Sequence, residues 1–290
     1  MSLQRRKLML MQQDKNQYIP FADVTVASIC ATNWGDGVGL TYAQAEQVTS
    51  LDCKFRATAI EHFDELKYFT GLVSLNAEEF RWCESLKTLS FPTKLAIIGQ
   101  QAFQGAKNLQ SPIDLPNVTS IGYQCFNDCG INNIPHYGAG TNPIPYFNAP
   151  KLQGYVSLLL GGSSVREIRS LGNVSSITYY GLWNTYLKKV KFPETAYTAE
   201  NFGWEWDCDF FETADFGGLT KYSGELLPYC KSGKALIFRT MTPPSIDSIY
   251  SGLSAECKFY APDDALDTYK GTAPFSNFAD RFLPLSEYAD

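Results

Sequence analysis

This sequence has little of what catalysis and metal binding most often use. Only two of its 290 residues are histidine, and its eight cysteines include no C-x-x-C pair. A zinc site or a histidine-activated nucleophile therefore has almost no imidazole to draw on. The motifs G-x-S-x-G, H-E-x-x-H, G-x-G-x-x-G and the phosphate-binding P-loop do not occur. We predict that the protein is not an enzyme and has no catalytic residues, metal or cofactor.

Positive charge and long apolar runs are also scarce. Lys and Arg number 24 against 30 Asp and Glu, a formal net charge of −6, so the basic excess typical of nucleic-acid-binding proteins is missing. No stretch approaches the roughly 20 apolar residues of a membrane span. The apolar run after the basic residues at 5–7 is shorter than the roughly 7 to 15 residues of a signal peptide. We expect no nucleic-acid partner, no membrane insertion and no signal peptide in this chain.

What the chain does contain is a repeat. Three apolar residues recur 23 positions later in the same order: Leu86, Ile98 and Phe103 return as Leu109, Ile121 and Phe126. The stretch 187–193 restates the stretch 86–92 further along. Such a period is typical of leucine-rich repeats, in which each coil adds a short strand to a parallel sheet and is stable only against its neighbours. We predict a leucine-rich repeat solenoid, mainly β with short helical or 3-10 turns.

Small residues at fixed places in the repeat suggest how a coil is built. Gly99, Gly122 and the glycine after Leu171 follow an apolar residue, and we expect them at corners with positive φ. Cysteines stand where other coils have alanine, as at Cys83 and Cys129. We therefore expect buried, structural free thiols, and eight titratable thiols in the denatured, unreduced chain. Four or fewer would indicate disulfides and export.

The repeat divides the chain into three parts. Residues 1–56 form an N-terminal tail and a small helical cap, and residues 57–234 form the solenoid. Excursions from the period lie near 137–149 and 194–218. Residues 235–290 form a C-terminal closing segment. We predict one elongated, right-handed solenoid that is capped at its N-terminal end, because solenoids need polar-faced ends.

The repeats and the end of the chain resemble a known family. The segment 63–72 and the recurring pattern C/A-x-x-L…F/L-P…I-G…A/C-F are similar to the BspA-like leucine-rich repeat proteins of anaerobic bacteria. The stretches 259–270 and 282–287 are similar to that family's closing segment. Family members are implicated in attachment to surfaces, matrix proteins or other cells. The resemblance implies a bacterial binding protein at the cell surface or outside the cell.

In relatives, the segment that corresponds to the N-terminal cap can resemble the calcium loop of an EF-hand or a dockerin. A calcium loop needs side-chain oxygens at positions 1, 3 and 5 and a glutamate at position 12. With Gly37 at position 6, Asp36 fits position 5, but Trp34 falls at position 3 and Ala43 at position 12. We therefore expect a degenerate loop within a cap and no calcium site.

One segment concentrates aromatic and acidic residues where the period is interrupted. Its candidate ligand-binding residues are Trp204, Trp206, Asp207 and Asp209. Indole rings stack on the C–H faces of sugars, and carboxylates accept hydrogen bonds from sugar hydroxyls. The alternative is that Trp204 and Trp206, two positions apart, share the inward face of one strand and pack in the core.

Three functions stay open. The first is a non-enzymatic recognition or adhesion module, a monomer that binds a protein or glycan of a host or bacterial surface. The second is a structural spacer in a bacterial surface or phage-tail-like assembly, which has no reason to keep an exposed aromatic patch. The third is a carbohydrate-active enzyme that uses Asp207 and Asp209. His62 and His136 belong to no motif, and we assign them surface or structural roles.

Overall fold

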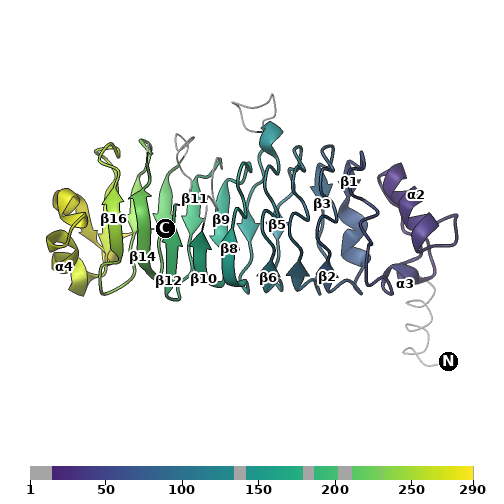
Figure 1. The fold of residues 1–290 in the computed structure, drawn as a ribbon, viewed down its shortest axis with the longest axis horizontal. Helices are drawn as coiled ribbons and strands as arrows, with labels where there is room; N and C mark the ends of the chain where they lie inside the picture. Colours follow the sequence, from purple (N-terminus) through teal and green to yellow (C-terminus); the bar gives the residue numbers. More distant parts are fainter. Residues whose placement is uncertain (1–14, 134–141, 179–185, 202–210, 229, 290) are drawn as a thin grey trace.

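The computed structural model describes residues 15–133, 142–178, 186–201, 211–228 and 230–289. Coils follow one another along the long axis of the molecule, with two helices, α2 (Val24–Asn33) and α3 (Tyr42–Ala45), at one end (Figure 1). A third helix, α4 (Leu266–Gly271), lies at the other end. The arrangement is a mainly β leucine-rich repeat solenoid, which confirms the predicted fold class. Within the described residues, no helix has the length and apolar character that crossing a bilayer requires.

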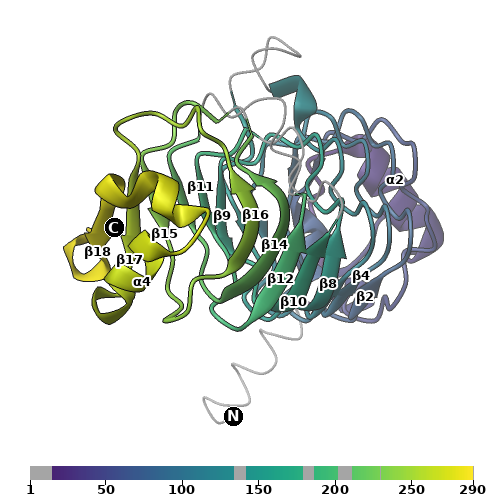
Figure 2. The ribbon, with the colours of Figure 1, turned by 60° about the vertical axis from the view of Figure 1, so that its left-hand side comes forward.

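The strands form two parallel rows along the coils, which we call the odd ladder and the even ladder. Each ladder consists of two hydrogen-bonded sheets, divided between β3 and β5 in the odd ladder and between β6 and β8 in the even ladder. In Figure 2 the strands β8 to β16 of the even ladder lie side by side, with β9 and β11 behind them. The odd ladder contains β1 (His62–Phe63), β3 (Thr88–Leu89), β5 (Ile113–Asp114), β7 (Phe147–Asn148), β9 (Glu167–Ser170), β11 (Lys189–Lys191), β13 (Thr213–Asp215), β15 (Ala235–Ile237), β17 (Lys258–Ala261) and, at its end, β18 (Phe282–Pro284). The even ladder contains β2 (Ser74–Leu75), β4 (Ile97–Ile98), β6 (Ser120–Ile121), β8 (Gln153–Ser157), β10 (Asn173–Thr178), β12 (Tyr197–Glu200), β14 (Leu219–Leu226) and β16 (Ser245–Ile249).

Short 3-10 helices complete the described elements. They are η1 (Asp64–Tyr68), η2 (Ile131–Asn133), η3 (Asp263–Ala265), η4 (Phe275–Arg281) and η5 (Leu285–Glu287). We call the solvent side of the odd ladder the odd-strand face and that of the even ladder the even-strand face. These two surfaces present the side chains that alternate outward along each strand.

The sequence period sets the strand register. Leu75 pairs with Ile98, and Ile98 pairs with Ile121, so equivalent residues of successive coils stand side by side. All three side chains are buried. Because successive side chains of a strand point to opposite faces, the neighbours of each buried residue face solvent. A coil of constant length therefore stacks apolar rows inward and polar rows outward.

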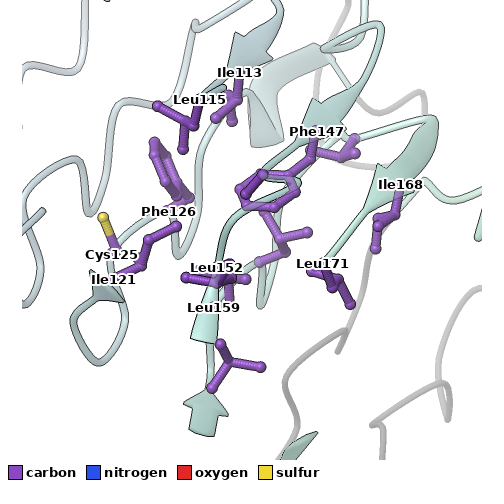
Figure 3. Packing of buried hydrophobic residues seen from close by; sticks show 14 of the residues in the cluster. Ile113, Leu115, Ile121, Cys125, Phe126, Phe147, Leu152, Leu159, Ile168 and Leu171 are labelled. Carbon is purple, nitrogen blue, oxygen red and sulfur yellow. The ribbon is translucent and has the colours of Figure 1, made fainter. Parts of the chain in front are cut away.

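A column of phenylalanines runs through the core in the first half of the solenoid. The ring centroids of Phe55 and Phe80 are 5.4 Å apart, those of Phe80 and Phe103 are 5.1 Å apart, and those of Phe103 and Phe126 are 5.2 Å apart. Figure 3 shows Phe126 and Phe147 among aliphatic side chains from neighbouring coils. Such ring pairs stabilise a core by about 0.5–1.5 kcal/mol beyond their burial. The stacking of Phe80, Phe103 and Phe126 follows directly from their 23-residue spacing.

The glycines of the repeat serve a purpose different from the predicted one. A Cβ on Gly99 would lie 2.4 Å from the Ala77 nitrogen, and a Cβ on Gly122 would lie 2.2 Å from the Gln100 nitrogen. Both glycines have ordinary negative φ, so the expectation of positive φ is wrong for them and holds for Gly172, at +59°. Gly99 and Gly122 are small because the backbone of the preceding coil passes against them.

The positive-φ corner of these coils is occupied by longer side chains. Glu78, Gln101 and Gln124 have φ of 63°, 56° and 55°, and they occupy one repeat position in three successive coils. Left-handed backbone is uncommon outside glycine, asparagine and aspartate. The neighbouring coils hold it through backbone hydrogen bonds, as from the Gln101 N–H to the Tyr123 carbonyl at 2.8 Å.

The N-terminal helices are tied to the first coil by one carboxylate. Asp23 caps α2 by accepting hydrogen bonds from the backbone N–H groups of Thr25 and Val26, at 2.8 and 3.2 Å. Its second oxygen accepts from the Glu61 N–H at 2.6 Å. In the adjacent loop, Asp36 accepts from the Val38 and Gly39 N–H groups and closes a turn. Asp23 therefore joins the helical segment to the repeats.

Five of the seven described cysteines are buried free thiols, as predicted, whereas Cys53 is free but partly exposed. Cys83, Cys125 and Cys129 are buried free thiols that replace small apolar residues in the layers of the core. Cys230 is disulfide-bonded, so the expectation of eight free thiols is wrong. Sequence spacing gives no warning of this, because a disulfide depends on two Cα atoms coming within about 7 Å of each other in the fold.

The two expected excursions contain regular strands. Within 194–218, β12 continues the even ladder and β13 continues the odd ladder. Within 137–149, β7 pairs with both β5 and β9. The apolar pattern is hard to see here because Tyr197 and Ala199 fill inward positions that leucine or isoleucine fills in other coils. The ladders are therefore more regular than the sequence pattern.

Candidate functional site

A groove crosses the odd-strand face in the first half of the solenoid. It has a volume of about 890 Å³ and is lined by residues that follow β1, by β3 and β5, by residues 142–146 and by Arg166. Polar side chains in this lining include Asp64, Thr88, Ser90 and Asp114. Its volume is within the range of about 300–1,000 Å³ that is usual for ligand sites. The groove is our candidate binding site.

One end of the groove is acidic and hydroxyl-rich. Asp64, at the start of η1, accepts hydrogen bonds from the hydroxyls of Thr88 at 2.6 Å and Ser90 at 3.1 Å. These two hydroxyls flank the inward-facing Leu89 on the next coil. Asp114, one coil further on, accepts from the Asn148 side-chain amide at 2.8 Å. The carboxylate oxygens keep further lone pairs, so this end accepts additional hydrogen bonds from a bound molecule.

A chain of contacts links a histidine to this acidic end without forming a nucleophile. The Nδ1 of His62 lies 2.9 Å from the Thr88 hydroxyl oxygen. Because the Thr88 hydroxyl donates its proton to Asp64, the His62 Nδ1 is the donor in its contact with Thr88. A general base must instead accept the hydroxyl proton. The chain therefore fixes side-chain orientations at the groove.

The other end of the groove carries an aromatic wall and an arginine. The guanidinium of Arg169 lies 3.6 Å from the centroid of the Tyr146 ring and holds this ring in place. Arg166 lies beside Tyr186, 5.7 Å from its ring centroid. Its Nε is buried and has no hydrogen-bond partner in the described part of the chain. A buried donor without a partner is costly, and a ligand acceptor would satisfy it.

A smaller cavity lies on the same face, one coil beyond the groove. It has a volume of about 160 Å³ over β9, β11 and β13. Arg239 donates to both carboxylate oxygens of Asp215 here, at distances from 2.6 to 3.0 Å. Lys189 and Lys191 also line this cavity. This part of the odd-strand face therefore carries cations that the acidic end of the groove lacks, together with the acidic Glu167 and Asp215.

The even-strand face carries exposed apolar side chains. Val73 is 51% exposed, Ile97 48%, Tyr123 43% and Tyr155 68%. Tyr123 and Tyr155 line a cavity of about 280 Å³. These residues lie on or beside β2, β4, β6 and β8, which are neighbours in the even ladder. An exposed aromatic patch of this kind is the feature that we expected of a recognition module and not of a spacer.

The four residues predicted as a ligand site lie outside the described residues. Trp204, Trp206, Asp207 and Asp209 fall in 202–210, and His136 falls in 134–141. Among the described residues, no cluster of three histidine, cysteine or acidic side chains is arranged to hold a metal ion. Asp64, Tyr146 and Arg166 line the groove but were not predicted as site residues.

A signal for the missed residues exists in the repeat itself. In each coil, the residues next to the inward-facing residue of an odd strand point outward. Thr88 and Tyr146 each precede an inward-facing residue and Asp114 follows one, so they belong to two outward rows. Tyr146 lies 58 positions after Thr88, which is not a multiple of 23, so the period alone does not align these two residues. The 23-residue period is visible in the apolar residues, whereas the groove is built from their polar neighbours.

The comparisons with known proteins agree with the geometry. A family model described as BspA type leucine rich repeat region (6 copies) matches residues 72–142. Over residues 72–142, which we call the BspA-type region, the chain is similar to BspA-type leucine-rich repeats. These repeats include β4 and β6 and much of the groove, and stacked repeats present extended binding surfaces. The BspA-type region therefore makes this part of the chain a repeat module of the kind that is used for interactions.

Beyond the BspA-type region, one solved structure gives a more distant likeness. A leucine-rich repeat protein from Bacteroides ovatus ATCC 8483 is 15% identical to this chain, with a TM-score of 0.37. The match covers 74% of this chain and 56% of the other, so this chain spans little more than half of that structure. None of the curated proteins matches the chain.

Proposed function

We propose that the protein is a non-enzymatic recognition or adhesion module that binds a surface protein or glycan in the groove of the odd-strand face. The observation that carries this proposal is the groove itself, about 890 Å³ in volume, which crosses several coils. Its lining combines the Tyr146 ring with carboxylate, hydroxyl and guanidinium groups. Ligand sites typically combine apolar walls with a few oriented polar groups of this kind.

Two further features support recognition at a cell surface. The exposed tyrosines Tyr123 and Tyr155 favour a binding protein over a structural spacer, because a spacer gains nothing from exposed aromatic rings. Disulfides persist in oxidising compartments, and Cys230 is disulfide-bonded. The disulfide therefore supports a location outside the cytosol, as the resemblance to surface proteins implies.

A blocking variant tests this function directly. Thr93 is exposed and lines the groove, so Thr93→Trp fills the groove without removing a side-chain contact. Thr198 is an exposed threonine of β12 on the even-strand face, and Thr198→Trp is the matched control. We expect saturable binding of the wild-type protein to a member of a combined array of glycans and extracellular-matrix proteins. This binding should be lost in Thr93→Trp and kept in Thr198→Trp.

Each other outcome contradicts part of the proposal. Binding that survives in Thr93→Trp and is lost in Thr198→Trp would move the site to the even-strand face. Binding that both variants keep would move it away from both tested positions. The absence of binding to every member of the array would favour the structural spacer. Far-ultraviolet circular dichroism of all three proteins must agree for the comparison to hold.

A further inference from the structure

Positive charge is unevenly distributed over this acidic molecule. The chain has a formal net charge of −6, yet lysine and arginine gather on and beside its odd strands from β9 to β17, among the acidic Glu167, Glu212 and Asp215. The cations on or beside these odd strands are Arg166, Arg169, Lys188, Lys189, Lys191, Lys234, Arg239 and Lys258. In contrast, β8, β10, β12 and β16 of the even ladder contain no lysine or arginine, and β14 contains only Lys221. A cation on this face that lacks an acidic partner is available to attract an anion locally.

Most of these cations already have acidic partners. Four ion pairs join odd-strand cations to glutamates at 2.9 to 3.5 Å, and Arg239 pairs with Asp215 at 2.6 Å. Arg166, Lys189 and Lys258 belong to none of the ion pairs found among the described residues. Arg166 forms one end of the groove, and its carbonyl accepts the Lys189 N–H at 3.2 Å from the next coil. Of these three cations, Arg166 and Lys189 are neighbours, whereas Lys258 lies on β17.

The acidic end of the groove restricts which anions fit. Asp64 and Asp114 repel a molecule that presents only negative charge, such as an acidic peptide. They accept hydrogen bonds from hydroxyl groups, which sugars supply on every ring. The Tyr146 ring adds an apolar surface for C–H groups. One class of molecule, the acidic glycans, provides both features. Its hydroxyls suit Asp64 and Asp114, and its anionic groups suit Arg166 and Lys189.

The dimensions allow one chain to meet both ends. Asp64 follows β1, and Arg166 immediately precedes β9. These strands are four coil steps apart, or about 19 Å at roughly 4.8 Å between neighbouring parallel strands. Lys189 lies one further coil along the same direction. A glycan of several residues is an extended chain that lies along such a path, whereas a single sugar reaches one end only.

We propose that the groove binds an acidic glycan, whose carboxylate or sulfate group contacts Arg166 and Lys189 and whose hydroxyls donate to Asp64 and Asp114. The proposal rests on the recognition function above and specifies its ligand class. Carboxylate and sulfate both suit a guanidinium, because each offers two oxygens to its paired N–H donors. The experiment therefore includes a carboxylated and a sulfated probe.

Four probes separate the chemical requirements. Polygalacturonate carries carboxylates, its methyl ester has a similar backbone without charge, chondroitin sulfate adds sulfate groups, and polyglutamate carries carboxylates without sugar hydroxyls. Isothermal titration calorimetry of the full chain should detect polygalacturonate or chondroitin sulfate. The methyl ester and polyglutamate should bind at least about tenfold more weakly, and higher ionic strength should weaken the acidic-glycan complex.

Matched variants locate the contact. Arg166→Gln and Lys189→Gln each remove one free cation and should each weaken acidic-glycan binding about tenfold, in line with the loss of a charge-assisted hydrogen bond. Lys221→Gln removes an exposed lysine from β14 on the even-strand face and should leave binding unchanged. Lys189 is exposed, so Lys189→Gln keeps the test valid even where Arg166→Gln disturbs packing.

The results that would overturn the acidic-glycan site differ from those that would overturn the recognition function. Equal weakening by Lys189→Gln and Lys221→Gln would show diffuse charge attraction and overturn the site. Equal binding of polyglutamate would overturn the glycan in favour of an acidic polypeptide. Groove-dependent binding of a neutral glycan or an uncharged protein surface, lost in Thr93→Trp, would leave the recognition function standing and remove the acidic ligand. An absence of binding to every probe and array member would overturn both proposals.

Discussion

The rings of Phe103 and Phe126 lie almost parallel, at an interplanar angle of 4° with their centroids 5.2 Å apart. Phe103 also stacks on Phe80 at 5.1 Å, so it joins two coils to its own. Phe103→Ala should lower the free energy of unfolding by about 3–5 kcal/mol, because it leaves a cavity and removes both stacked contacts. Urea denaturation followed by circular dichroism measures this change.

Two variants control the test. Phe103→Leu keeps most of the volume and should cost clearly less than Phe103→Ala. Tyr155→Ala removes an aromatic ring that is 68% exposed and should change stability by no more than about 0.5 kcal/mol. Similar losses in Phe103→Ala and Tyr155→Ala would contradict the stabilising role of the phenylalanine column.

A glycine substitution tests the close approach of neighbouring coils. Gly122→Ala places a Cβ 2.2 Å from the Gln100 nitrogen, a backbone atom that moves only if a coil shifts. We expect a loss of about 1–3 kcal/mol, the usual cost of overpacking. Gly271→Ala is the control, because an added Cβ there meets nothing within 4 Å and φ is not positive. Thermal unfolding should show a lower midpoint for Gly122→Ala alone.

The sequence predicted the fold well because residues one period apart in the chain are the residues that stack on one another in neighbouring coils. The recurrence of Ile98 as Ile121 predicts both their burial and their pairing. The reason for Gly122 was not predictable, since it depends on how close the Gln100 backbone passes. That distance is a property of the stacked coils. Because glycine is favoured both at a tight corner and at a close backbone contact, a glycine in the sequence does not distinguish the two.

The candidate site was less predictable than the fold. Asp64 and Arg166 are about a hundred positions apart in the chain and belong to no motif, yet both line one groove. Their proximity follows from the number of coils between them and from the faces on which they project. A cluster of aromatic and acidic residues that are close in sequence, as at 202–212, is easier to recognise than a site whose residues come from separate coils.

A buried glutamate gives the solenoid a specific pH dependence. Glu79 is 1% exposed and accepts hydrogen bonds from the backbone N–H groups of Cys53 at 2.5 Å and Asn76 at 3.2 Å. Burial raises the pKa of Glu79 above its ordinary value of 4.5, although these hydrogen bonds oppose the shift. A raised folded-state pKa means that the contribution of Glu79 to stability is fully present below 4.5 and declines as pH rises through the higher folded-state value.

Comparison with Glu79→Gln isolates this effect. The stability of the wild-type protein relative to Glu79→Gln should be greatest at low pH and should fall as the pH is raised towards neutrality. Contributions from other titrating groups cancel in the difference. Denaturant titrations of both proteins at several pH values measure it. A relative stability that instead increases with pH would show that the two backbone hydrogen bonds outweigh burial and lower the pKa.

Counting thiols tests the disulfide at Cys230 and its bearing on location. The chain has eight cysteines, six described cysteines are free, and Cys230 is disulfide-bonded. One disulfide uses two thiols, so Ellman's reagent should titrate six thiols in the denatured, unreduced protein and two more after reduction. In the native protein, Cys53 should react first, because it is partly exposed whereas the other five free thiols are buried.

The thiol count also distinguishes the origin of the protein. Protein purified from an oxidising compartment should give six thiols, and protein purified from a reducing cytosol should give up to eight, because glutathione and thioredoxin keep thiols reduced there. Eight thiols in both preparations would show that the protein forms no disulfide, and the disulfide would then no longer support a surface location. The Cys230→Ser variant tests whether the disulfide stabilises the fold. It should lose stability relative to the oxidised wild-type protein and match the reduced wild-type protein if the bond stabilises the fold.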